Sequence, residues 1–133
     1  ERRDALRILA FATGAVEKAL QIVMERVFRP EAIRHAPFVE RCRTQMRGAL
    51  GELDRICVAA ADREWLVGGA LDKSRMTQAD ITVGCFVTYL HEAVPEPLDA
   101  YPVLRARVAR YEALPVFQQF HVPFDPPKPG STG

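Results

Sequence analysis

The chain has 133 residues, of which 48% are hydrophobic and 26% charged, a balance typical of one globular domain with a buried core. Its 18 Lys and Arg nearly cancel its 17 Asp and Glu, so charge favours neither a nucleic-acid partner nor a membrane-surface partner. No apolar run approaches the roughly 20 residues of a membrane span, and the first residues lack a signal-peptide segment. The chain begins without Met and with a helical pattern already at Ala5, so we expect it to be a fragment of a longer protein.

A long first helix is predicted from about Arg3 to Phe28, because apolar residues recur three and four positions apart. This stripe comprises Leu6, Leu9, Thr13, Val16, Leu20, Val23 and Val27. A strip of small residues runs beside it, namely Ala5, Ala12, Ala15 and Ala19. We expect close helix packing against the small strip, with the wall of a ligand pocket as the alternative. Pro30 ends this helix, and too few heptads precede it for a coiled coil.

A second long helix is predicted to begin with Pro37 as its first residue. Its apolar stripe is Val39, Cys42, Met46, Leu50, Leu53, Ile56 and Ala60, and its outward face carries Arg41, Arg43, Arg47, Glu52 and Arg55. Two amphipathic helices joined by a short link predict an antiparallel hairpin. The longest irregular stretch follows, from Asp62 to Arg75. Trp65 lies in it and is expected to fill a gap in the bundle, with ligand stacking as the alternative.

The stretch from Met76 to Ile81 predicts the start of a third helix. Thr77 is an N-cap candidate, and the Asp80 side chain can accept the Thr77 backbone N–H, which is the reciprocal pattern of a capping box. Met76 and Ile81 flank the box as a hydrophobic staple. From Ile81 to about Ala93 the helix is nearly free of charge, so we expect it in the middle of a bundle. Asp80 also resembles a catalytic carboxylate, but capping is its favoured role.

Two shorter helices complete the pattern. One starts at Tyr101-Pro102 with Pro102 at its first position, and its inner side carries Val103, Leu104, Val108 and Tyr111. The other begins at Pro115 and carries Val116, Phe117 and Phe120. No segment alternates with the period of a strand. The sequence therefore predicts an all-α bundle of about five helices over residues 1–120, followed by a Pro-rich, mobile tail over residues 121–133.

The residues that usually carry metal or nucleophilic chemistry do not converge in this sequence. No metal-ligand spacing relates the three cysteines, Cys42, Cys57 and Cys85. Their odd number indicates free, mostly buried thiols in a reducing cytosol. The three histidines are far apart, so no metal site is expected from His35, His91 and His121. Gly68-Gly69 does not follow a strand, so it is no phosphate loop.

The capping box lies between sequence motifs that occur in a fixed order. Trp65-Leu66-Val67-Gly68 precedes it, and Tyr101-Pro102-Val103-Leu104 and Ala113-Leu114-Pro115 follow it. This order resembles the C-terminal helical domain of the cytosolic glutathione S-transferases, bacterial type. That family has a Trp-Leu-x-Gly turn, a Ser/Thr-x-x-Asp box, Tyr-Pro-x-Leu-x-x-Trp-x-x-Arg and Ala-Arg-Pro. The resemblance covers residues 1–120 and departs at Arg107, where the family usually has Trp, and at Leu114, where it often has Arg.

The resemblance implies a cytoplasmic enzyme that conjugates glutathione, as co-substrate, to small electrophiles without a tightly bound cofactor. A thioredoxin-like N-terminal domain, absent from this chain, would bind glutathione and activate its thiol. The helical domain would supply most of the electrophile pocket and, through its first two helices, a homodimer interface. No catalytic residue is then expected within this chain. We expect the isolated chain to be inactive and to self-associate through apolar surface that its partner domain normally covers.

The family's pocket residues map onto two places in this sequence. The resemblance implies electrophile-binding residues on the first helix and near the end of the chain, namely Phe11, Gly14, Ala15, Lys18, Phe120 and His121. In beta-like bacterial members a Leu-His-Lys segment reaches glutathione, and Val16-Glu17-Lys18 matches it. Glu17 replaces the His, which puts His-dependent thiol chemistry in doubt. Lys18 retains the ability to meet a glutathione carboxylate, although a solvated surface position is its favoured interpretation.

Other functions share this fold. The same helical domain assembles complexes in translation elongation factors and aminoacyl-tRNA synthetases, so a non-catalytic interaction module is the alternative. Related isomerases, dehalogenases and ether-cleaving enzymes retain both the fold and glutathione but catalyse other reactions. The resemblance alone leaves these open.

Overall fold

The computed structural model describes residues 1–68 and 75–126 of the chain. Within these residues it contains five α-helices and no strand, which confirms the predicted all-α bundle. The helices are α1 (Arg2–Val23), α2 (Ala36–Ala59), α3 (Gln78–Ala93), α4 (Pro102–Glu112) and α5 (Pro115–Phe120). A π-helical turn, Met24–Phe28, extends α1, and two 3-10 turns occupy Glu31–Ile33 and Leu98–Ala100. None of the described helices is long and apolar enough to cross a membrane.

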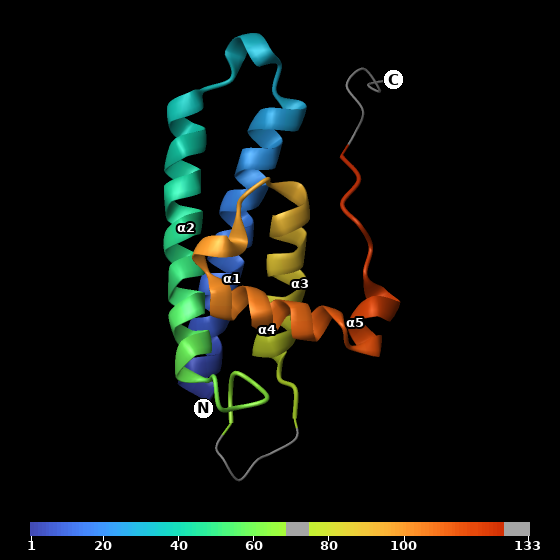
Figure 1. The fold of residues 1–133 in the computed structure, drawn as a ribbon. Coiled ribbons are helices and arrows are strands. Elements are labelled where there is room, and N and C mark those ends of the chain that lie inside the picture. The colour runs from blue at the N-terminus through green and yellow to red at the C-terminus, as the bar shows by residue number, and fades with distance from the viewer. Residues whose placement is uncertain (69–74, 127–133) are drawn as a thin grey trace.

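Helices α1 and α2 form the predicted antiparallel hairpin, α3 lies beside α1, and α4 runs across the bundle toward α5 (Figure 1). Helix α2 begins one residue before the predicted Pro37, with His35 as its N-cap. The buried Glu25 carboxylate accepts the His35 backbone N–H at 2.7 Å and an Arg29 N–H at 2.5 Å. Glu25 thereby ties the end of the first helix to the start of the second. Both contacts lower its pKa below the ordinary value.

The core-facing side of α1 includes most of the strip of small residues, together with Ile8, Ile22 and Val23. The deeply buried members of the strip are Ala12, Ala15 and Ala19, each 1% exposed or less. By contrast, Leu6 is 56% exposed and Leu20 is 49% exposed. Helix α1 packs against both α2 and α3, and small side chains are the ones that fit where helix backbones approach closely. Close packing against the small strip is therefore confirmed, and much of the larger apolar stripe faces outward.

Helix α3 begins with the predicted capping box, in which both reciprocal bonds are present at Thr77 and Asp80. Its burial is less complete than predicted. Ile81 is 39% exposed and the Cys85 thiol is also exposed, whereas Cys42 and Cys57 are buried as expected. The expectation of a helix enclosed on all sides is wrong for this face, because α5 and the following segment stand off from α3 and leave a cavity.

Helix α4 has the predicted Pro102 at its first position and Tyr101 as its N-cap. Its inner side buries Leu104, Val108 and Tyr111, as predicted. A contact that sequence reasoning missed fixes its start, because the Asp54 carboxylate on α2 accepts the Val103 and Leu104 N–H groups at 3.0 and 2.8 Å. This carboxylate satisfies amides that no helical carbonyl reaches.

One predicted surface position is partly covered. Arg43 was expected on the outward face of α2, but its side chain is only 21% exposed. It lies 3.5 Å from the buried Glu96 carboxylate, which also accepts an Arg47 N–H at 2.5 Å. These contacts join α2 to the loop that follows α3.

Candidate functional site

A cavity with a volume of about 740 Å³ lies between α3, the end of α4, α5 and the segment after α5. Most of its wall is apolar or aromatic: Met76, Ile81, Tyr89, Val116, Phe117, Phe120 and Val122. Helical spacing explains the α3 side, since Ile81, Cys85, Thr88 and Glu92 recur every three or four residues. One wall of the cavity is therefore the face of α3 that carries these four residues.

Two carboxylates supply the charge on the cavity wall. Glu112 of α4 accepts the Thr88 hydroxyl hydrogen bond at 2.6 Å. Glu92 of α3 lies with one oxygen 2.7 Å from His121 Nε2, and its other oxygen accepts the Phe124 N–H at 3.0 Å. Among the described lining residues there is no Lys or Arg. The formal negative charge of the described wall therefore comes from Glu92 and Glu112, beside the neutral polar Thr88 and Gln118 and the imidazole of His121.

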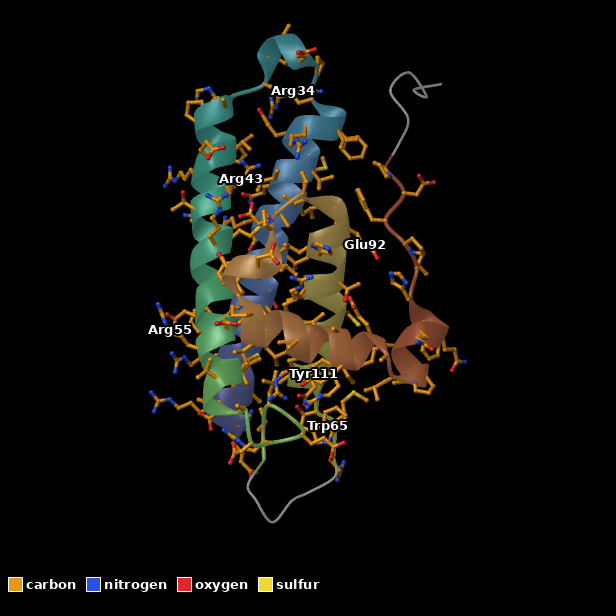
Figure 2. The ribbon with its side chains drawn as sticks, in the orientation of Figure 1. Arg34, Arg43, Arg55, Trp65, Glu92 and Tyr111 are labelled. Atoms are coloured by element: carbon orange, nitrogen blue, oxygen red, sulfur yellow. The ribbon has the colours of Figure 1, made fainter. Side chains whose placement is uncertain are left out.

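Glu92 also holds the segment after α5 beside the cavity. The label in Figure 2 marks it on α3, on the side of the helix that faces this segment. The Tyr89 and Phe124 rings meet edge to face with centroids 5.5 Å apart, next to the Glu92 contacts. A polar anchor and an aromatic contact thus fix the cavity rim that Phe120 and His121 form.

An aromatic stack lies behind Phe117, which lines the cavity. Phe117 stacks on Tyr111 and Tyr111 stacks on Trp65, each pair with ring centroids 5.9 Å apart. Figure 2 labels Tyr111 and Trp65 next to each other. Gly84 permits this arrangement, because a Cβ there would lie 2.5 Å from the Phe117 ring and 3.3 Å from the Tyr111 ring. Trp65 is partly buried and packs against the bundle, as predicted.

A buried polar cluster anchors that stack. One Asp80 oxygen accepts the Tyr111 hydroxyl at 2.6 Å and the Leu66 N–H at 2.8 Å. The other accepts the Thr77 N–H and hydroxyl at 2.9 and 2.8 Å. Burial and the Asp80 contact raise the pKa of Tyr111 well above its ordinary value. Every Asp80 contact is thus internal, in agreement with a structural role.

Arg107, which replaces the family's usual Trp, joins this cluster. Its guanidinium is buried and donates to the carbonyls of Ala60 at 2.6 Å and Glu64 at 3.1 Å. These carbonyls lie at and just beyond the end of α2, where no helical N–H is available to them. Arg107 thus places a cation at the C-terminal end of α2, where the helix dipole favours positive charge.

The exposed Cys85 lines the cavity but is poorly suited to nucleophilic catalysis. Desolvation by its packed surroundings raises the pKa of the thiol above its ordinary value, and a thiol rather than a thiolate is a weak nucleophile. Among the described residues no group of His, Cys, Asp and Glu is arranged to hold a metal ion.

The predicted site residues fall into two groups that this cavity does not unite. Phe120 and His121 line it, together with Met76 and Ile81 of the predicted staple. The predicted residues on α1 do not line this cavity. Phe11 lies under the Arg7 guanidinium, and Lys18 Nζ is 3.4 Å from Gln21 Oε1. Ala15 is buried in the core with 1% exposure, Gly14 is half-buried and Glu17 is exposed. Their binding roles stay predictions.

Sequence reasoning missed the α3 contribution, above all Thr88, Tyr89 and Glu92. A signal was present, because these residues continue the helical spacing of Ile81 and Cys85 on one face. A second, smaller cavity of about 450 Å³ lies at the start of α1 and is lined by charged residues, including Asp4, Arg7 and Arg63.

Comparison with known proteins gives consistent matches. The family model of the glutathione S-transferase C-terminal domain matches residues 15–115. A glutathione S-transferase from Methylobacterium radiotolerans, solved in complex with glutathione sulfonate, is similar with 32% identity and a TM-score of 0.74, covering 92% of this chain and 54% of that one. One from Methylobacillus flagellatus, with glutathione bound, has 25% identity and a TM-score of 0.73, covering 87% and 54%. None of the curated proteins matches. The chain spans about half the length of these solved relatives.

Proposed function

Because this chain belongs to the glutathione S-transferase C-terminal domain family, we propose that it is the electrophile-binding half of a bacterial-type enzyme that conjugates glutathione to small electrophiles. The observation that carries the proposal is the aromatic cavity between α3 and α5. Its volume of about 740 Å³ lies within the range of small-molecule sites, which are mostly apolar with a few polar groups.

In this proposal the chain binds and orients, and a thioredoxin-like domain activates the thiol. The glutathione thiolate attacks the electrophilic carbon, a C–S bond forms, and the leaving group departs with its electron pair. The aromatic wall of Tyr89, Phe117 and Phe120 holds the electrophile and keeps water from it, which contributes through positioning. Lys18, Phe11 and Gly14 on α1 stay proposed contacts for glutathione or its electrophile.

The outward apolar side chains of the first helix support a homodimer. Leu6, Leu20, Met24 and Phe28 are each about half exposed, and large exposed apolar surfaces typically mark a protein contact. We assign them to the proposed interface through α1 and α2, in a cytoplasmic protein. Sedimentation velocity tests this, since Leu20→Asp should shift a dimer toward monomer.

The enzyme proposal is tested by calorimetric titration of glutathione into the full-length protein that carries this chain after its glutathione-binding domain. We expect saturable binding of one glutathione per subunit, followed by conjugation of aromatic electrophiles. Residues 1–133 alone should bind none. A folded full-length protein that binds no glutathione would overturn the proposal and favour the interaction module.

A further inference from the structure

The cavity wall combines aromatic surface with carboxylates, and this combination bears on which molecules it accepts. Tyr89, Phe117 and Phe120 offer flat apolar surface, which suits an aromatic ligand. Glu92 and Glu112 lie on the same wall, from α3 and α4 respectively. A ligand that stacks on the rings therefore lies close to two acidic groups.

Neither carboxylate is neutralised by an Arg or Lys among the described residues. Glu112 is bound to the neutral hydroxyl of Thr88. Glu92 contacts His121 and the Phe124 N–H, so its one titratable partner is an imidazole. With His121 neutral, the described lining has a formal charge of −2, from Glu92 and Glu112.

We propose that this cavity selects aromatic molecules that are neutral or positively charged, and that Glu92 and Glu112 exclude aromatic anions. The inference rests on the proposed function and names the substrate class of the same site. A carboxylate within several ångströms repels an anion and attracts a cation, and partial enclosure weakens the screening by water. We expect about a tenfold preference for a cation over an anion of equal shape at low salt, shrinking as salt is added because both carboxylates reach solvent.

The test uses three naphthalene derivatives that differ in the polar group on the ring. They are the cation naphthylmethylammonium, the neutral naphthylmethanol and the anion naphthoate. Each competes with the neutral fluorophore N-phenyl-naphthylamine for the full-length protein at low micromolar protein concentration. The expected order of affinity is ammonium, then alcohol, then carboxylate. The ratio of the first to the last should fall several-fold between low and high salt, a readout that needs no variant.

Glu112→Gln isolates one of the charges. The amide oxygen still accepts the Thr88 hydroxyl, so the wall keeps its shape while the charge is lost. The cation-to-anion ratio should fall about threefold, with the alcohol unaffected. The matched control is Glu40→Gln, which removes an exposed α2 carboxylate that pairs with Arg43 away from the cavity; it should leave the ratio unchanged. Glu92→Gln is a second variant with the same expectation.

The outcomes separate the two proposals. Equal affinity for the three compounds, or tighter binding of naphthoate, would overturn the charge selection and leave the electrophile cavity in place. A salt-independent ratio would also overturn it. If the reporter and all three compounds fail to bind, the proposed cavity function fails and the inference fails with it.

Discussion

Gly84→Ala places a methyl group into the aromatic stack behind the cavity. The new Cβ would lie 2.5 and 2.9 Å from two Phe117 ring carbons and 3.3 Å from a Tyr111 ring carbon. Tyr111 is held by its hydrogen bond to Asp80, so the Phe117 ring has to move. Phe117 is on the six-residue α5 and is half-buried, and we expect its displacement toward the cavity.

Two opposing contributions set the size of the effect. Replacing Gly by Ala in a helix interior stabilises by about 1 kcal/mol. Overpacking a well-packed site costs about 1–3 kcal/mol. We expect a net destabilisation of about 1 kcal/mol, together with a several-fold loss of affinity for N-phenyl-naphthylamine as the ring narrows the cavity.

Urea denaturation followed by circular dichroism measures the free energy of unfolding. Gly48→Ala on α2 is the matched control, because a Cβ there meets nothing within 4 Å; it should stabilise by about 1 kcal/mol. In a Phe117→Ala background, Gly84→Ala should lose most of its cost, since only the 3.3 Å contact with the Tyr111 ring remains. If Gly84→Ala stabilises the unmodified chain as much as Gly48→Ala does, Phe117 does not pack over Gly84 and the reasoning is refuted.

Three other outcomes are expected. Asp80→Ala should lower the free energy of unfolding by about 2–4 kcal/mol, because it removes the cap and leaves the Tyr111 hydroxyl and Leu66 N–H without their acceptor; a loss below 1 kcal/mol in urea denaturation would contradict the buried network. A maleimide should label Cys85 before the buried cysteines, slowly at neutral pH and faster as pH rises, since the pKa of this thiol is raised; mass spectrometry would reveal any other order. Glu25 has a lowered pKa, so its contribution is present above the ordinary value of 4.5 and is lost as pH falls through the lowered value. Glu25→Gln should therefore reduce the fall in the free energy of unfolding over that pH range. An unchanged pH dependence of stability would contradict the role given to Glu25.

The local signals in the sequence predict the fold well. Thr77 and Asp80 form their box, and Pro102 and Pro115 open their helices, because capping and proline geometry depend on a few neighbouring residues. The core face of α1 was harder to predict. The core face of α1 combines Ala12, Ala15 and Ala19 with Ile8, Ile22 and Val23, whereas a periodic stripe of Leu and Val shows only that a helix forms.

The site was predicted only in part. Phe120 and His121 were predicted from the resemblance to bind the electrophile, and both line the cavity, but their binding role stays a prediction. The pairs that shape it, Glu92 with His121 and Thr88 with Glu112, join residues more than 20 positions apart. No local spacing encodes such pairs, because they depend on how α3, α4 and α5 pack.

The most direct test of the electrophile cavity is a crystal structure of the full-length protein with the thioether conjugate of glutathione and a naphthylmethyl group. Our proposal predicts the naphthyl ring against Tyr89 and Phe117, between α3 and α5. A naphthyl ring bound away from Tyr89 and Phe117, with the α3–α5 cavity unoccupied, would contradict it.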